Sequence, residues 1–237
     1  MSRGLGDVYK RQTYKLAKQG KKHKRAPQDM DIHPVIVGHE CSGDIVQVGK
    51  KWQDQFKPGE KFALQPALNY QGKLDSPGYS YRYCGGAATY CIMPHEVMEL
   101  GCLLKYDGDS YFKASLGEPM SCIIGGYHAN YHTNKHNYDH AMGTKVGGSI
   151  LIMGGCGPMG LGAVSYGLTF ENKPKRIVVT DVDDAKIERA KQCITVEEAA
   201  EKGIELIYFN TAKAKDAEAE LMAITDGKGY DDIFVYV

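Results

Sequence analysis

The second half of the chain alternates short apolar runs with longer segments in which apolar residues recur every three or four positions. Short runs rich in valine and isoleucine predict buried strands, and the amphipathic segments predict helices. We expect strands at residues 149–153, 176–180, 206–209 and 233–237, and helices at 160–169, 184–192 and 195–203. Strands that alternate with helices in this way favour a parallel, doubly wound sheet.

The first half of the chain has a different pattern, in which short apolar groups are separated by glycine and proline. We expect short strands at residues 45–48, 62–64 and 88–93, with turns between them. Many short strands at turn-bounded intervals favour a small barrel or sandwich. A helix follows this region, because Asp109 or Ser110 can cap a segment that continues to Leu116.

The composition is that of an ordinary globular protein and narrows the possible partners. Of the 237 residues, 43% are hydrophobic and 24% are charged, so a packed core is possible. Lysine plus arginine and aspartate plus glutamate both number 29, and this balance favours neither nucleic acid nor a membrane surface as a partner. The basic cluster at residues 21–25 fits a solvated surface, with a phosphate or nucleic-acid patch as the alternative.

The 7 cysteines are scattered, and no two of them form a C-x-x-C pair. This pattern fits reduced thiols in a cytoplasmic protein better than a disulfide framework. It also argues against a structural zinc site made of four cysteines. No apolar run approaches the roughly 20 residues of a membrane-spanning helix, and no secretory signal is visible.

A glycine-rich loop lies between the predicted strand 149–153 and the helix that follows it. Gly155, Gly157 and Gly160 form a G-x-G-x-x-G motif, with Pro158 and Met159 inside it. We expect Gly155 to allow the tight turn, Gly157 to admit a pyrophosphate, and Gly160 to let helix and strand pack closely. The N-terminus of the helix would supply N–H donors to the phosphates.

Asp181 ends the next predicted strand, at the spacing of an acidic residue that accepts hydrogen bonds from the ribose of a dinucleotide. A carboxylate there repels a 2′-phosphate, so we expect NAD(H) rather than NADP(H). Lys186 in the following helix completes the candidate cofactor-binding residues. The alternative is a glycine-rich turn in an unrelated α/β protein that binds no nucleotide.

His39 and Glu40 form a second candidate site. A neutral imidazole and a carboxylate are both ligands that zinc accepts. A histidine beside a glutamate is nevertheless common without any metal, so the pair alone is a weak signal.

The surrounding residues give the pair more weight, because Gly38-His39-Glu40-x-x-Gly43-x5-Gly49 resembles the zinc motif of medium-chain alcohol dehydrogenases. The glycine-rich loop follows at the distance expected for that family. Between the two motifs, Leu116-Gly-Glu118-Pro-Met-Ser121 resembles the sorbitol-dehydrogenase branch. Residues 62–68, 78–86 and 118–122 are most similar to L-sorbose-1-phosphate reductases, and the resemblance covers residues 13–237.

The resemblance implies an α/β protein with a β-rich N-terminal part: a GroES-like catalytic domain at residues 13–125 and a partial Rossmann domain at 126–237. It implies one catalytic zinc, held by a cysteine, by His39 and by Glu118, with no structural zinc. Glu40 would be an alternate ligand or a base beside the metal, so His39 and Glu40 are the expected catalytic residues. The implied reaction transfers hydride between NAD(H) and a polyol or ketose, with L-sorbose 1-phosphate and a hexitol phosphate as a candidate pair.

The two ends of the chain also carry expectations. Residues 1–12 resemble a translated sequencing adapter, and we interpret them as an assembly artefact. The family's cysteine ligand should lie near Thr13, yet no cysteine precedes Cys41. The chain also ends inside the predicted strand 233–237. We therefore expect a piece of a longer homo-oligomeric enzyme, inactive by itself. A zinc-free reductase or a non-catalytic nucleotide-binding protein are the alternatives.

Two further features have competing interpretations. Arg82 could clamp a phosphate or the hydroxyls of a substrate, or it could belong to an aromatic packing loop. His128, His132, His136 and His140 recur every fourth residue, which would align them on one helix face as a metal stripe. We favour an ordinary helix after the Glu118-Pro119 segment over a second metal site, because the stretch is rich in asparagine and tyrosine.

Overall fold

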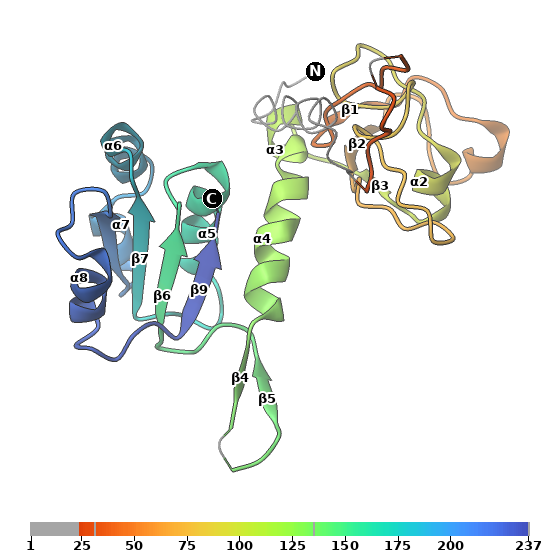
Figure 1. The fold of residues 1–237 in the computed structure, drawn as a ribbon. Helices are drawn as coiled ribbons and strands as arrows, with labels where there is room; N and C mark the ends of the chain where they lie inside the picture. Colours follow the sequence, from red (N-terminus) through yellow and green to blue (C-terminus); the bar gives the residue numbers. More distant parts are fainter. Residues whose placement is uncertain (1–23, 31, 135, 237) are drawn as a thin grey trace. The chain divides into compact units, whose positions relative to one another are not determined.

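The computed structural model describes residues 24–30, 32–134 and 136–236, and these fall into two compact units, Met1–Pro119 and Met120–Val237 (Figure 1). The boundary lies in the first turn of helix α4 (Gly117–Ala129), and the expected division after residue 125 lies further along the same helix. The expected artefact at 1–12, the position near Thr13 and residues 21–23 of the basic cluster lie outside the described residues.

The first unit contains a three-stranded antiparallel sheet in the order β1-β2-β3. Its strands are β1 (Ser42–Asp44), β2 (Lys61–Leu64) and β3 (Leu103–Lys105). The 3-10 helix η1 (Lys50–Trp52) and the helices α2 (His95–Glu99) and α3 (Tyr111–Ser115) complete the unit. Along β2 the side chains alternate, so Phe62 and Leu64 enter the core while their neighbours do not. The buried cluster consists of Cys41, Phe56, Phe62, Leu64, Leu68, Val97 and Leu103.

In this unit the predicted helix is present, whereas one predicted strand is absent and another is displaced. Ser110 caps α3, since its side chain accepts a hydrogen bond from the Lys113 N–H, so the predicted helix is confirmed. The strand predicted at residues 88–93 is wrong: the chain there is irregular up to α2. Tyr90 and Ile92 are 75% and 71% exposed. These residues favour strands, but here they are not paired with another strand and do not pack into the core. The strand predicted at 45–48 lies instead at β1, just before Ile45.

The second unit contains a four-stranded parallel sheet in the order β8-β7-β6-β9. Its strands are β6 (Ser149–Met153), β7 (Arg176–Asp181), β8 (Glu205–Asn210) and β9 (Asp232–Val235). The helices are α5 (Pro158–Gly167), α6 (Asp184–Cys193), α7 (Val196–Glu201) and α8 (Ala217–Ile224). The predicted alternation is confirmed, although α8 was not among the predicted helices.

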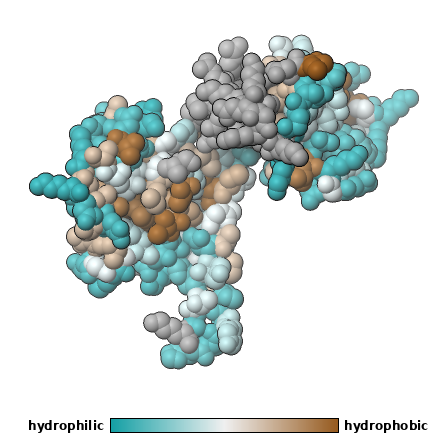
Figure 2. All heavy atoms as spheres, viewed as in Figure 1, coloured by the Kyte–Doolittle hydropathy of each residue, from teal (hydrophilic) through white to brown (hydrophobic). Residues whose placement is uncertain are grey.

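Apolar residues fill the layer between this sheet and its helices, because the central strands are buried on both faces. In Figure 2 apolar residues also gather on the visible face of this unit, in the region of β6 and β9. Met153, Ile233 and Val235 are among the exposed apolar residues of these strands. Within the described residues, no helix has both the length and the apolar character needed to cross a membrane.

The hairpin formed by β4 (Tyr131–Thr133) and β5 (His140–Met142) lies between α4 and β6 in the sequence. It rules out a histidine stripe on one helix face, because His128 is in the last turn of α4 while His132 and His140 are on different strands of the hairpin. His132 instead contacts the buried Asp232, with Nε2 3.1 Å from Oδ1. The four-residue spacing therefore does not align these side chains on a helix.

Helix α4 packs against α5 through a buried tyrosine and a glycine. The Tyr127 hydroxyl donates to the Ala163 carbonyl oxygen at 2.8 Å. A Cβ at Gly167 would lie 2.6 Å from that hydroxyl oxygen and 3.0 Å from Ile177 Cδ1. Glycine at this position therefore lets the two helices approach.

We expect Gly167→Ala to reduce the free energy of unfolding by about 1–3 kcal/mol, the usual range for overpacking a core. Gly125→Ala in α4 is the matched control, because a Cβ there meets no atom within 4 Å. It should leave stability unchanged or raise it by up to about 1 kcal/mol through helix propensity. Urea unfolding followed by circular dichroism measures both, and equal stability of the two variants would contradict the packing argument.

Candidate functional site

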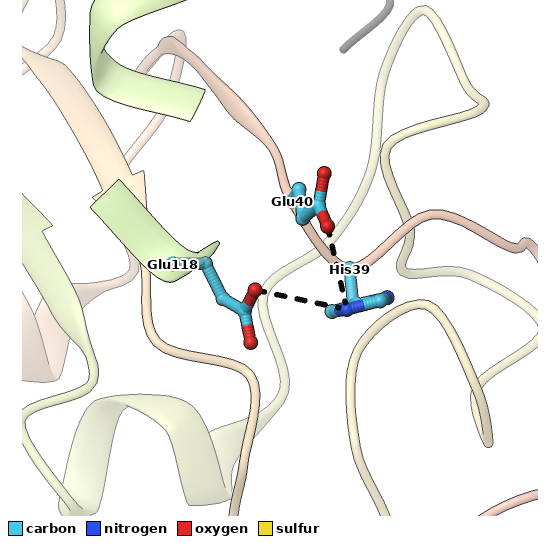
Figure 3. A group of neighbouring side chains, drawn as sticks. All are labelled: His39, Glu40 and Glu118. Atoms are coloured by element: carbon cyan, nitrogen blue, oxygen red, sulfur yellow. Dashed lines mark ion pairs between the residues drawn. The ribbon is translucent and has the colours of Figure 1, made fainter. Parts of the chain in front are cut away.

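His39 and Glu40 lie in the loop immediately before β1, and Glu118 lies in the first turn of α4. His39 Nε2 is 3.9 Å from Glu40 Oε1 and 3.8 Å from Glu118 Oε2. The three side chains are mostly buried, with exposed fractions of 17%, 13% and 13%. Figure 3 shows both carboxylates directed at the imidazole. Among the described residues, this is the one group of three or more potential metal-ligating side chains, with ligand atoms all within 4.8 Å of one another.

These three residues fit a zinc ion by the chemistry of their donor atoms. Zinc accepts imidazole nitrogen and carboxylate oxygen, and two ligands of one tetrahedral zinc ion are about 3.3–3.5 Å apart. The observed separations from Nε2 exceed that range by a few tenths of an ångström, which side-chain rotation can close. Two mostly buried carboxylates beside one another also favour a bound cation. The cysteine that the resemblance implies has no counterpart in this group.

Tyr79 is a fourth neighbour of this group, and no sequence motif marked it as one. Its hydroxyl oxygen is 3.3 Å from His39 Nε2, and the two ring centroids are 4.8 Å apart. The preceding residue, Gly78, has φ +77°, and a Cβ there would lie 2.5–2.6 Å from the backbone of Gly38 and His39. The sequence signal for this contact was only the glycine before the tyrosine, because the approach depends on two distant loops meeting.

Arg25 holds the loop that carries Tyr79. Its Nη1 donates to the carbonyl oxygens of Leu68 and Leu74, both at 2.9 Å, and to Ser76 Oγ at 2.6 Å. Ser80 Oγ in turn donates to the Arg25 carbonyl oxygen at 2.5 Å. The guanidinium of Arg25 thus holds the segment at Leu68, Leu74 and Ser76, and its main-chain carbonyl oxygen holds it at Ser80.

Arg82 is exposed, and its charge acts on Asp29. The pKa of Asp29 is lowered, first by the hydrogen bond with His33 and to a smaller extent by the charge of Arg82. A nearby carboxylate would compete with a phosphate for this guanidinium. The phosphate clamp at Arg82 stays a prediction.

The glycine-rich loop joins β6 to α5, and its glycines have different tasks. Gly154 and Gly155 both lie in the turn after β6, and Gly154 is the one in the left-handed region, with φ +65°. A Cβ at Gly155 would lie 2.6 Å from Val179 Cγ1, and one at Gly160 only 2.3 Å from Gly155 Cα. A Cβ at Gly157 would meet nothing within 4 Å. Gly155 and Gly160 thus permit packing, while Gly157 borders open space.

The N-terminus of α5 adjoins that open space. Gly157 is the N-cap and offers no side-chain hydrogen bond, and Pro158 stands in the first turn, where its missing N–H is not needed. The first N–H groups of a helix suit the phosphates of a dinucleotide. Met159 is half-buried and packs against the core of this unit. These residues fit a pyrophosphate.

Asp181 ends β7, and its side chain is 7% exposed. Its Oδ1 accepts from the N–H groups of Val182 at 2.8 Å and Asp183 at 3.2 Å, which fixes the carboxylate at the edge of the sheet. Lys186 is exposed in the first turn of α6. Burial raises the pKa of Cys156, in the glycine-rich loop, to about 11, and the positive charge of Lys186 opposes that rise. The positive charge of Lys186 therefore acts on the glycine-rich loop.

Comparison with known proteins shows what this chain resembles. Residues 9–101 match the model of the alcohol dehydrogenase GroES-like domain. A mannitol-1-phosphate 5-dehydrogenase of Aliivibrio fischeri is 50% identical over 94% of this chain and 53% of its own length. An L-sorbose 1-phosphate reductase of Klebsiella pneumoniae is 42% identical over 95% of this chain and 53% of its own length. The chain spans about half the length of the curated relatives it matches.

A solved structure shares the fold. The glucose dehydrogenase of Haloferax mediterranei, solved with NADP, Zn and gluconolactone, aligns with a TM-score of 0.56 at 13% identity. The alignment covers 86% of this chain and 54% of that protein. From these similarities, together with the parallel sheet of a partial Rossmann domain, we conclude that the chain belongs to the medium-chain polyol dehydrogenase family.

Proposed function

We propose that this chain is part of a zinc-dependent oxidoreductase that transfers hydride between NAD(H) and the alcohol or ketone of a polyol or ketose. The convergence of Glu40 and Glu118 on Nε2 of His39 carries the proposal. The relatives named for mannitol 1-phosphate and L-sorbose 1-phosphate support a phosphorylated hexitol and ketose as the substrate class. The division into a catalytic domain at 13–125 and a nucleotide domain at 126–237 belongs to the same proposal.

Each residue of the group has a distinct task in this mechanism. His39 presents a neutral imidazole nitrogen, and Glu118 supplies the negative charge that holds a divalent cation. Glu40 is either a further ligand or a base that receives the proton of the alcohol. Zinc, when bound, supplies a Lewis acid that polarises the oxygen of the substrate. Because all three side chains are mostly buried, the charge separation occurs where water screens it poorly.

Metal analysis together with a turnover assay tests the proposal. The chain, purified in the presence of zinc, should carry about one zinc ion, as one group of three ligands holds one ion. Oxidation of mannitol 1-phosphate, followed by NADH absorbance, tests the reaction itself in a protein that includes this chain. A chain that takes up no zinc would overturn the proposal.

The nucleotide is expected to be NAD(H), for an electrostatic reason. The Asp181 carboxylate is fixed at the end of β7, and a 2′-phosphate placed beside it would meet a like charge. We expect NADH to bind at least about tenfold more tightly than NADPH, which corresponds to about 1.4 kcal/mol. Fluorescence titration with the two nucleotides measures the ratio, and Asp181→Ser should reduce it. A tenfold preference for NADPH in the unmodified chain would contradict this expectation.

A further inference from the structure

The Tyr79 hydroxyl approaches the same nitrogen as the two carboxylates and comes closer to it than either. The distance from Tyr79 Oη to His39 Nε2 is 3.3 Å, against 3.9 Å for Glu40 and 3.8 Å for Glu118. The separation between two neighbouring ligands of a tetrahedral zinc ion is about 3.3–3.5 Å. An oxygen atom therefore already lies at the distance from Nε2 that another zinc ligand would have.

We propose, on the basis of the proposed function, that Tyr79 is a substrate-contacting residue that selects for polyhydroxylated substrates. In the resting site its hydroxyl marks the position of the substrate oxygen. When the substrate enters, that position passes to the substrate, and the neutral hydroxyl of Tyr79 hydrogen-bonds to a hydroxyl group beside the reacting carbon. A phenol hydroxyl both donates and accepts, so it suits either a donor or an acceptor on the substrate.

The backbone and the ring of Tyr79 are positioned by several contacts. Gly78 lies directly against the backbone of Gly38 and His39, so the Tyr79 backbone has little freedom. The Gly78 N–H donates to the Cys84 carbonyl oxygen at 3.1 Å, and the Tyr79 N–H donates to that of Ser76 at 3.1 Å. The tyrosine ring lies over the imidazole at an interplanar angle of 32°. A group positioned in this way loses little conformational entropy when it binds a substrate.

Such a residue would distinguish substrates by whether they carry a hydroxyl group on the carbon next to the reacting one. A hexitol or ketose carries a hydroxyl on the carbon next to the reacting one, whereas a simple secondary alcohol does not. A site built to hydrogen-bond a substrate hydroxyl binds an analogue without it poorly, because its own polar group is then left unpaired. Tyr79 should therefore affect polyols and leave simple alcohols unaffected.

Tyr79→Phe tests this, since phenylalanine keeps the ring over His39 and removes only the hydroxyl. Tyr83→Phe is the matched control, because Tyr83 is an exposed tyrosine of the same segment that contacts Tyr81. Zinc affinity is measured by competition with a chromophoric chelator. Binding of D-mannitol 1-phosphate and of 2-propanol is measured by titration of the cobalt-loaded chain, followed by its visible absorption.

We expect Tyr79→Phe to bind zinc within about threefold of the unmodified chain and to bind D-mannitol 1-phosphate about three- to tenfold more weakly, as for one lost neutral hydrogen bond. Affinity for 2-propanol should not change, and Tyr83→Phe should behave as the unmodified chain. Equal mannitol 1-phosphate affinity with and without the hydroxyl would overturn the role of Tyr79 and leave the proposed function standing.

Two other results would also overturn the inference. A loss of zinc affinity greater than tenfold in Tyr79→Phe would make Tyr79 a support of the metal site instead of a selector of substrate. Failure of the unmodified chain to take up zinc or cobalt would overturn the proposed function, and the inference with it. Metal uptake without mannitol 1-phosphate binding would overturn the inference alone.

Discussion

Replacing His39 with alanine is expected to abolish zinc uptake and, with it, any alcohol oxidation. Nε2 of His39 is the atom on which both carboxylates converge, so the substitution removes the one nitrogen ligand of the group. Loss of a residue that merely supports a ligand lowers metal affinity by about 10–100-fold. Loss of the ligand itself should therefore lower it by at least about 100-fold. Chelator competition measures the affinity, and inductively coupled plasma analysis measures the stoichiometry.

The control for this variant is His95→Ala. His95 is an exposed histidine in α2 of the same unit, and its Nε2 is 3.4 Å from Glu99 on the surface. It should leave zinc stoichiometry unchanged, which excludes a general effect of removing an imidazole. If His39→Ala retains its zinc, the metal is bound by other residues, and the assignment of His39, Glu40 and Glu118 as its ligands is wrong.

The second large effect is expected when Gly157 and Gly160, two glycines of the same motif, are replaced by alanine. A Cβ at Gly160 would lie 2.3 Å from the backbone of Gly155, so Gly160→Ala must push α5 away from the turn. We expect a loss of about 3 kcal/mol in the free energy of unfolding, the upper end of the usual range for overpacking. A Cβ at Gly157 meets nothing, and its φ of −88° suits any residue, so Gly157→Ala should fold with unchanged stability.

NADH binding separates the tasks of these two glycines. The methyl group of Gly157→Ala would occupy the space that we assign to the pyrophosphate, so NADH affinity should fall about tenfold or more, or about 1.4 kcal/mol. Urea unfolding and NADH fluorescence titration on the same preparations give both quantities. Unchanged NADH affinity in a stable Gly157→Ala variant would place the nucleotide elsewhere.

The second unit could be predicted closely because its signals are local. Strand β6 is a continuous apolar run, as expected for a parallel strand buried on both faces, and its bounds agree with the prediction. The cap of α7 was readable in the same way, since Thr195 accepts from the Glu198 N–H. The hairpin β4–β5 escaped prediction because its loop carries no two-residue turn motif such as Asn-Gly.

The first unit shows where a single sequence stops being informative. Residues 88–93 have strand-forming side chains, but a strand also needs a partner, and pairing is a long-range property that propensity does not encode. The residues of the candidate site also differ in how far the sequence could predict them. His39 and Glu40 stand in a motif, and Glu118 was suggested by family resemblance alone. The approach of Tyr79 follows from loop packing, which no local pattern records.

Arg25 has a consequence for the order in which the first unit folds. Its hydrogen bonds close loops of 43, 49 and 51 residues, and the bond from Ser80 closes one of 55. Contacts between residues so distant in sequence form slowly, because the chain entropy of loop closure is lost before the contact is gained. The segment over His39 is thus expected to be among the last parts of the unit to order. During synthesis, the metal ligands would be exposed to competing ions before the tyrosine closes over them.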